Sequence, residues 1–187
     1  MIRMHRDIQR VLISQYQIMA RVKEMAERIT ADFTDHDITI VPVMTGAMIF
    51  CGDLIRQIPI QMRIGLLAVS SYPGASLSTR GSQVVSQQLG DVRGRHVLLI
   101  DDILDSGGTL KLVIPAVQSL GAATVKTCVL LRKDRPAARE VEVDYVGFEI
   151  PDEFVVGYGL DYNNYYRNLP DIVTLKQEAI EAGAERK

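Results

Sequence analysis

The sequence has few cysteines, and this scarcity argues against two classes of protein. Its two cysteines, Cys51 and Cys128, stand apart in apolar stretches, with no CxxC or Cys/His spacing around them. Neither a disulfide framework nor a structural zinc site is therefore expected. A chain without such covalent or metal cross-links fits a reducing cytoplasm, which is the location that we expect.

Long apolar runs and an excess of positive charge are also missing. Arg3, Arg6 and Asp7 interrupt the first residues, and no apolar run reaches the roughly eighteen residues of a spanning helix. We therefore expect neither a secretory signal nor a membrane contact. The net charge is -2 and the pI is near 5.9. Nucleic-acid binding is not expected either, because phosphate recognition normally requires a basic domain.

The length and composition suit one globular domain. Of the 187 residues, 47% are hydrophobic, and a chain of this size should bury about 70% of its unfolded surface. One loop-like stretch, about 70–82, is rich in Ser and Gly around Tyr72-Pro73-Gly74. We expect a single domain over 1–187 that carries one flexible lid loop.

Hydrophobic periodicity predicts alternating helices and strands. Helical spacing occurs over about 14–33, from Gly46 to Ile58 and from Leu110 to Gly121, and Pro115 in the third of these segments should kink it. Strands are predicted over 38–44, 60–70, 83–89, 97–103, 124–131, 145–150, 155–160 and 172–175, with a polar helix from Gln177 onward. This alternation indicates an α/β fold whose twisted sheet is mainly parallel and flanked by helices.

Acidic and small residues follow the most strand-like segment, 97–103. Asp101, Asp102 and Asp105 lie at its carboxyl end, where parallel sheets bind ligands. Adjacent carboxylates accept hydrogen bonds from a vicinal diol, and a third carboxylate can exchange a proton with a ligand. The start of the next predicted helix offers free N–H groups to a phosphate. Its residues are Ser106, Gly107, Gly108 and Thr109. A phosphorylated sugar matches these features together.

Two segments resemble a known family. Residues 97–110 resemble the motif of type I phosphoribosyltransferases that binds PRPP, 5-phosphoribosyl 1-pyrophosphate: four apolar residues, two acids, two apolar residues, then Asp-Ser-Gly. Residues 143–162 and 166–170 are similar to the C-terminal hood of hypoxanthine-guanine phosphoribosyltransferases. The similarity runs from about Ile13 to Lys176. It implies the type I phosphoribosyltransferase fold, with a small hood built from N- and C-terminal segments, the latter about 143–176.

The resemblance implies roles for the residues that meet PRPP. Asp105 would be the general base or acid beside N7 of the purine. Asp101 and Asp102 would hold the ribose hydroxyls, and residues 106–109 would cradle the 5′-phosphate. Asp101, Asp102 and Asp161 are also the implied Mg²⁺ ligands, since hard oxygen ligands suit this ion.

Pyrophosphate is implied to bind Thr45, Gly46 and Arg167, because a guanidinium fork suits phosphate oxygens. The equivalent of the Met44–Gly46 loop can contain a non-proline cis peptide in this family. Many members carry lysine at the positions of Thr45 and Gly108, and glutamate is commoner at the position of Asp101. One pyrophosphate contact and the flank of the phosphate loop therefore depart from the family pattern.

Other implied roles concern the purine and the lid. Lys133 matches a lysine that touches the 6-oxo group, and an ammonium, which only donates, would reject the 6-amino group of adenine. Phe154 would stack on the base and Val155 would contact its edge through the backbone. Ser71 and Tyr72 resemble the lid tip that keeps water from the reacting ribosyl group. Without the resemblance, Lys133 would be a surface charge and Phe154 a core residue.

The resemblance therefore implies a Mg²⁺-dependent transfer of phosphoribose from PRPP to N9 of hypoxanthine, and of guanine, in purine salvage. The products would be IMP or GMP and pyrophosphate, and the enzyme would be a homodimer or homotetramer. A related RNA-binding regulator of the pyrimidine-attenuator type also retains the PRPP motif, but the acidic pI and the purine-type hood argue against it. A phospho-acceptor receiver domain would explain Asp101-Asp102, yet it leaves Ser106-Gly107-Gly108 and the hood unexplained.

Overall fold

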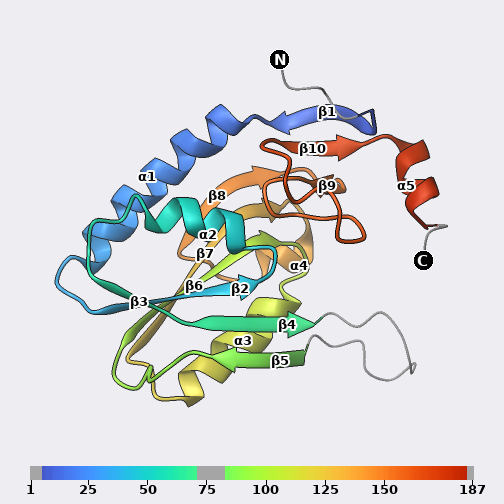
Figure 1. Ribbon diagram of the computed structural model, residues 1–187. Helices are drawn as coiled ribbons and strands as arrows, with labels where there is room; N and C mark the ends of the chain where they lie inside the picture. The colour runs from blue at the N-terminus through green and yellow to red at the C-terminus, as the bar shows by residue number, and fades with distance from the viewer. Residues whose placement is uncertain (1–5, 71–82, 185–187) are drawn as a thin grey trace.

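The computed structural model describes residues 6–70 and 83–184, and it confirms the predicted α/β fold (Figure 1). The large sheet has seven strands in the order β5-β4-β2-β6-β7-β8, with β3 paired to β2. Its strands are β2 (Ile38–Met44), β3 (Met62–Ile64), β4 (Leu66–Ser70), β5 (Gln83–Gln88), β6 (His96–Leu104), β7 (Thr124–Lys133) and β8 (Tyr145–Ile150). Every pair is parallel except β4 with β5. The two-sided apolar pattern of β6 is explained by its interior position.

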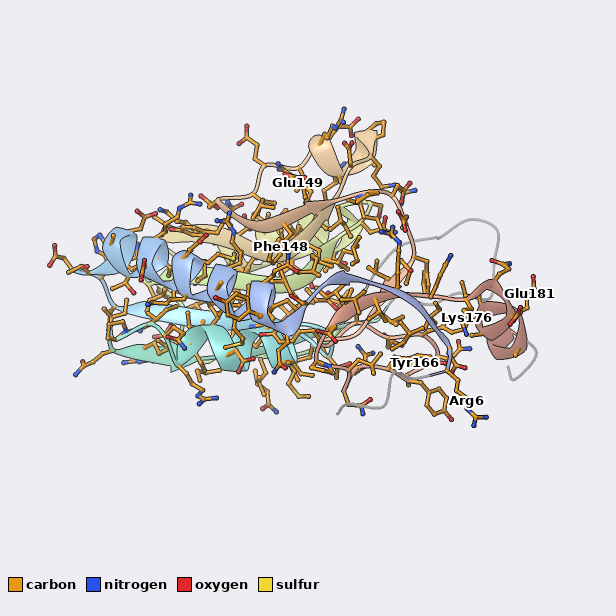
Figure 2. The ribbon with its side chains drawn as sticks, turned by 90° about the horizontal axis from the view of Figure 1, so that it is seen from above. Arg6, Phe148, Glu149, Tyr166, Lys176 and Glu181 are labelled. Carbon is orange, nitrogen blue, oxygen red and sulfur yellow. The ribbon has the colours of Figure 1, made fainter. Side chains whose placement is uncertain are left out.

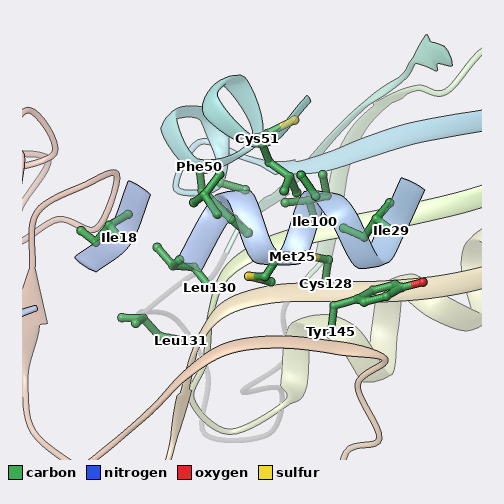
Figure 3. Packing of buried hydrophobic residues seen from close by; sticks show 14 of the residues in the cluster. Ile18, Met25, Ile29, Phe50, Cys51, Ile100, Cys128, Leu130, Leu131 and Tyr145 are labelled. Carbon is green, nitrogen blue, oxygen red and sulfur yellow. The ribbon is translucent and has the colours of Figure 1, made fainter. Parts of the chain in front are cut away.

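Helices cover both faces of this sheet. The helices α1 (Gln15–Phe33) and α2 (Met48–Ile55) pack on one face, and α3 (Gly108–Ser119) and α4 (Pro136–Arg139) pack on the other. Figure 3 shows Met25 and Ile29 of α1 beside Ile100 and Cys128 of the sheet. None of the helices within 6–70 and 83–184 is long and apolar enough to cross a membrane.

The ends of the helices follow local sequence signals. Ser14 caps α1: its hydroxyl accepts from the Gln17 N–H, and the Gln17 side chain accepts from the Ser14 N–H. This reciprocal capping box satisfies donors that the helix leaves unpaired. Pro115 lies inside α3, as the apolar spacing predicted.

Several predicted boundaries are wrong. The run 60–70 is divided at Gly65, whose N–H donates to the Ile40 carbonyl at 2.9 Å while its Cα packs against Leu89. The predicted strand 155–160 is reduced to β9 (Val155–Val156), because Gly157 has a φ of 99° and the chain turns there. The helix expected to reach Ile58 ends at Ile55. The four-residue α4 was not predicted, because one turn is too short for a periodic pattern.

A second, antiparallel sheet forms the hood. Its strands are β1 (Ile8–Ile13), β10 (Ile172–Leu175) and β9, in the order β1-β10-β9, and α5 (Gln177–Ala184) follows. The pairing of β1 with β10 confirms that N- and C-terminal segments build the hood. The hood lies beyond the arrowheads of the parallel strands (Figure 1), and Figure 2 shows Tyr166 and Lys176 at that end. The hood is thus positioned over the carboxyl edge of the large sheet.

Candidate active site

A cavity of about 600 Å³ opens at the carboxyl ends of β2 and β6. It is bordered by the end of β2 and the loop after it, by β6, by the start of α3 and by the hood. The sequence-predicted residues that it brings together are Thr45, Gly46, Asp101, Asp102, Thr109, Asp161 and Arg167. A second cavity of about 260 Å³ is lined by residues 101–110. The loop after β2, the loop 106–109 and the acidic pair Asp101-Asp102 therefore converge at one edge of the sheet.

The acidic pair forms the buried floor of both cavities. Asp101 is only 6% exposed, and burial, with the neighbouring Asp102 carboxylate, raises its pKa well above the ordinary value. Burial also raises the pKa of Asp102. One oxygen of each carboxylate accepts a backbone N–H, from Asp102 at 3.1 Å and from Ile103 at 2.9 Å. Two neighbouring carboxylates at this depth favour a bound cation or a shared proton.

The loop after β2 is packed against this pair. The Met44–Thr45 peptide is cis, which agrees with the family resemblance. Gly46 leaves no room for a side chain, since an added Cβ would lie 1.9 Å from Oδ2 of Asp102. On the other side, the Gly46 carbonyl touches Gly159 of the hood. The loop is thus held between the acidic pair and the hood.

The small-residue loop 106–109 leads into α3. Gly107 is the N-cap of this helix with a φ of 79°, and an added Cβ would lie 2.4 Å from Cγ2 of Val141. The Lys111 N–H makes the first helical hydrogen bond, to the Gly107 carbonyl at 2.9 Å. The earlier N–H groups of the first turn have no partner within the helix, an arrangement that favours the binding of an anion. The geometry suits a phosphate without the help of a side chain at Gly108.

Asp105 belongs to a cluster of four charged side chains, together with Lys133, Arg135 and Asp152. Lys133 is 9% exposed, and its Nζ lies 3.6 Å from Oδ2 of Asp105 and 3.5 Å from Oδ1 of Asp152. Arg135 joins the same two carboxylates: Nη1 donates to Asp105 and Nη2 lies 3.1 Å from Asp152. Lys133 is therefore a buried member of a charge network and not a solvated surface residue. Asp105, in turn, is held by two cations.

The hood contributes an aromatic ring and an ion pair. Phe154 is 45% exposed, and its ring meets that of Tyr162 edge to face, with centroids 5.4 Å apart. It is therefore not a core residue, whereas Val155 is buried in β9. Arg167 pairs with Asp161 at 2.7 Å, and the Asn164 N–H donates to the other Asp161 oxygen at 2.8 Å. Among the described residues, no group of three or more His, Cys, Asp or Glu is arranged to hold a metal ion.

This arrangement can be compared with known proteins. The model of the phosphoribosyl transferase domain family matches residues 12–163. The hypoxanthine-guanine phosphoribosyltransferase of Staphylococcus epidermidis is 41% identical over 175 residues, which cover 94% of this chain and 98% of that protein. The chain belongs to the phosphoribosyltransferase family. Within it, this hypoxanthine-guanine phosphoribosyltransferase matches along nearly its whole length.

A longer relative and a solved structure agree with this membership. The bifunctional protein TilS/HprT of Listeria innocua is 42% identical over 94% of this phosphoribosyltransferase chain, which spans 27% of that protein's length. The crystal structure of a hypoxanthine phosphoribosyltransferase from Staphylococcus aureus superposes with a TM-score of 0.88 at 37% identity, covering 96% of this chain and 98% of the other. The fold predicted from the motif is thus the fold of this family.

Some residues of the phosphoribosyltransferase site were not singled out from the sequence. Arg135, Asp152, Asn164 and Gly159 all contact predicted site residues. The charged run 132–135 was the only local signal for Arg135. Asp152 and Gly159 lie within the segment that resembles the family hood, but that resemblance assigned them no role. The predicted lid residues, Ser71 and Tyr72, lie outside the described residues.

Proposed function

We propose that this phosphoribosyltransferase transfers phosphoribose from PRPP to N9 of hypoxanthine, and of guanine, in purine salvage. One observation supports the proposal: the acidic pair Asp101-Asp102, the loop 106–109 and the loop after β2 converge beside Asp105, a carboxylate that is paired with the buried Lys133. The relative from Staphylococcus epidermidis is named for both bases, and the solved structure from Staphylococcus aureus is named for hypoxanthine. The products are IMP or GMP and pyrophosphate.

The PRPP-binding roles follow from the positions of the groups. Asp101 and Asp102 accept hydrogen bonds from the ribose hydroxyls, and the N–H groups of residues 106–109 hold the 5′-phosphate. Thr45, Gly46 and Arg167 bind the pyrophosphate group. This assignment is supported by the two cavities, which have Asp101, Asp102 and Thr109 in common. A ribose bound at the acidic pair would lie between the two loops.

Mg²⁺ is the proposed cofactor. The described cavity lining carries the carboxylates of Asp101, Asp102 and Asp161 against the single guanidinium of Arg167, while PRPP is itself strongly negative. A divalent cation would offset this excess of negative charge, since Mg²⁺ binds one or two carboxylates together with phosphate oxygens. When bound, Mg²⁺ supplies charge neutralisation for the departing pyrophosphate. Thr45 and Gly108 stand where many family members have lysine. With these two positive charges missing, the neutralisation of the phosphates depends more on Mg²⁺.

Asp105 carries the proton in the proposed step. The lone pair of N9 forms the bond to C1′ of PRPP, the bond from C1′ to the pyrophosphate oxygen breaks, and pyrophosphate leaves with that electron pair. The N7 proton of the purine passes to the Asp105 carboxylate, so the nucleotide product is neutral at the base. Lys133 and Arg135 both pair with this carboxylate and hold it in place beside the proposed purine position.

Phe154 and Lys133 are the proposed purine contacts. The half-exposed Phe154 ring offers a stacking face, and Val155 presents its backbone beside it. Lys133 donates to the 6-oxo group of the base. An ammonium has no acceptor for the 6-amino group of adenine, which accounts for selectivity toward 6-oxopurines.

The proposal also covers the cellular location, the oligomeric state and the partners of the enzyme. Cys51 and Cys128 are both free thiols, which supports a reducing cytoplasm. The exposed Val11 and Tyr16, near the junction of β1 and α1, support a contact between copies of the chain in a homodimer or homotetramer. The proposed partners are PRPP and the purine base, not nucleic acid or membrane.

Steady-state kinetics with separate bases test the proposed function. The purified chain with PRPP and Mg²⁺ should form IMP from hypoxanthine and GMP from guanine, and should use adenine poorly. Removal of Mg²⁺ with EDTA should abolish turnover, and added Mg²⁺ should restore it. The proposal fails if PRPP is not consumed with any 6-oxopurine under these conditions.

Lys133→Ala should weaken discrimination between bases. Without the ammonium, the ratio of kcat/KM for hypoxanthine to that for adenine should fall roughly 10- to 100-fold, the scale of a hydrogen bond to a charged group. Lys126→Ala is the matched control, because Lys126 is on the same strand but pairs with Asp32 away from the cavity. An unchanged ratio in Lys133→Ala would remove this residue from base selection.

A further inference from the structure

Tyr158 connects the hood to α2 through a hydrogen bond that the proposed roles do not use. Its hydroxyl donates to Oδ2 of Asp53 at 2.8 Å, and the residue is 4% exposed. Burial, together with the bond to Asp53, raises the pKa of Tyr158, so the hydroxyl keeps its proton and remains a donor. Asp53 lies in α2, the helix that begins directly after the Met44–Gly46 loop.

The backbone around Tyr158 touches both proposed pyrophosphate-binding groups. Gly157, Tyr158 and Gly159 have φ values of 99°, 49° and 104°, which form a tight turn. The Gly159 Cα lies against the Gly46 carbonyl so closely that an added Cβ would be 2.3 Å from that oxygen. The Gly159 carbonyl also accepts from Nη1 of Arg167 at 2.6 Å, and the Gly159 N–H donates back to the Arg167 carbonyl at 3.0 Å.

These contacts close a ring through the structure. From Gly46 the chain enters α2 and reaches Asp53, the hydrogen bond crosses to Tyr158, and the next residue, Gly159, returns to Gly46. The two partners are 105 positions apart in the chain, and their hydrogen bond ties a side chain of α2 to the turn. A change in the distance between α2 and the hood would therefore change the contact between Gly159 and the Gly46 carbonyl.

We propose that Tyr158 and Asp53 are positioning residues for the pyrophosphate group of PRPP. Their hydrogen bond holds the Gly157–Gly159 turn at a fixed separation from α2, and through Gly159 it sets the spacing between the Gly46 loop and Arg167. This inference rests on the proposed function, since it assigns the loop and Arg167 to pyrophosphate. Neither positioning residue needs to touch the substrate, because both act through Gly159.

Three variants and one control test the inference. Tyr158→Phe and Asp53→Ala each remove the hydrogen bond, whereas Asp53→Asn keeps an acceptor oxygen for the tyrosine. Tyr145→Phe is the matched control, because Tyr145 is also buried and donates to an aspartate on a helix, Asp32, but lies away from the cavity. The measurements are kcat, KM for PRPP, KM for hypoxanthine, and the Kd of magnesium pyrophosphate by calorimetry.

The expected result separates positioning from stability. Tyr158→Phe and Asp53→Ala should raise KM for PRPP and the Kd of magnesium pyrophosphate roughly three- to tenfold, the scale of one lost hydrogen bond. KM for hypoxanthine should stay at the wild-type value, and Asp53→Asn should resemble wild type. Tyr145→Phe should lower thermal stability without changing either pyrophosphate-side constant.

Two outcomes would overturn the inference: wild-type constants in both Tyr158→Phe and Asp53→Ala, or an equal rise in Tyr145→Phe. If Tyr158→Phe does not fold, the comparison of Asp53→Ala with Asp53→Asn decides the matter alone. The two proposals fail separately. A wild-type chain that makes no IMP rejects the proposed function, whereas an active wild type with unaffected variants rejects only the positioning role.

Discussion

Asp105→Asn is expected to lower kcat by about 10²-fold or more while PRPP binding changes little. An amide keeps the shape of the side chain and can still accept a hydrogen bond from Arg135, but it cannot take the N7 proton of the purine. The acidic pair and the phosphate loop, which hold PRPP in the proposed function, are untouched by the change. The measurements are kcat with hypoxanthine and the Kd of PRPP.

Asp134→Asn is the control for this prediction. It makes the same chemical change one residue from Lys133, but Asp134 pairs with Arg139 and faces solvent. Its kinetics should match those of the wild type. If Asp105→Asn also shows unchanged kcat, Asp105 has no part in proton transfer, and another group near the purine must carry it.

Gly46→Ala is the second change with a large expected effect. The added Cβ would lie 1.9 Å from Oδ2 of Asp102 and 2.6 Å from its Cγ, so either the loop or the carboxylate must move. Both belong to the proposed PRPP site, and a displacement near 1 Å costs about 10²-fold in rate. We expect kcat/KM for PRPP to fall by about that factor, measured at saturating hypoxanthine.

Gly52→Ala provides the matched glycine control. Gly52 is in α2, six residues further along, and an added Cβ meets no atom within 4 Å beyond the adjoining backbone of its own helix. Alanine is the better helix former, so this variant should keep wild-type kinetics and unfold at a slightly higher temperature. Wild-type values of kcat/KM for PRPP in Gly46→Ala would show that the tight contact with Asp102 is not needed.

The accuracy of prediction from sequence varied with the range of the interactions. The helix that begins after Ser14 was predicted closely, because the apolar spacing that predicted it is a local property of the sequence. The strand expected over 155–160 was too long, because valines and leucine favour a strand while Gly157 turns the chain toward Gly46. The β1 strand was not predicted, since its middle residues are exposed and its pairing partner, β10, is distant in the chain.

In the candidate site, too, the residues placed by local sequence were predicted, and the contacts between distant segments were not. Asp101, Asp102, Asp105 and the loop 106–109 all lie within the single segment 101–109, so the end of one strand and the start of the next helix position them together. The pairing of Arg135 with Asp105 joins residues 30 positions apart, and it depends on how β7 and the short α4 lie beside β6. A charged run such as 132–135 contains no information about which carboxylate it will meet.

The sequence by itself determined the α/β class and the family, and it predicted the loop proposed to bind phosphate and ribose, because periodicity and motif are properties of neighbouring residues. The tertiary structure decided that Lys133 is buried between two carboxylates, that Phe154 is exposed, and that Gly159 closes on Gly46. The physical reason is that burial and close packing arise where the hood meets the sheet edge. The strands of that hood come from opposite ends of the chain.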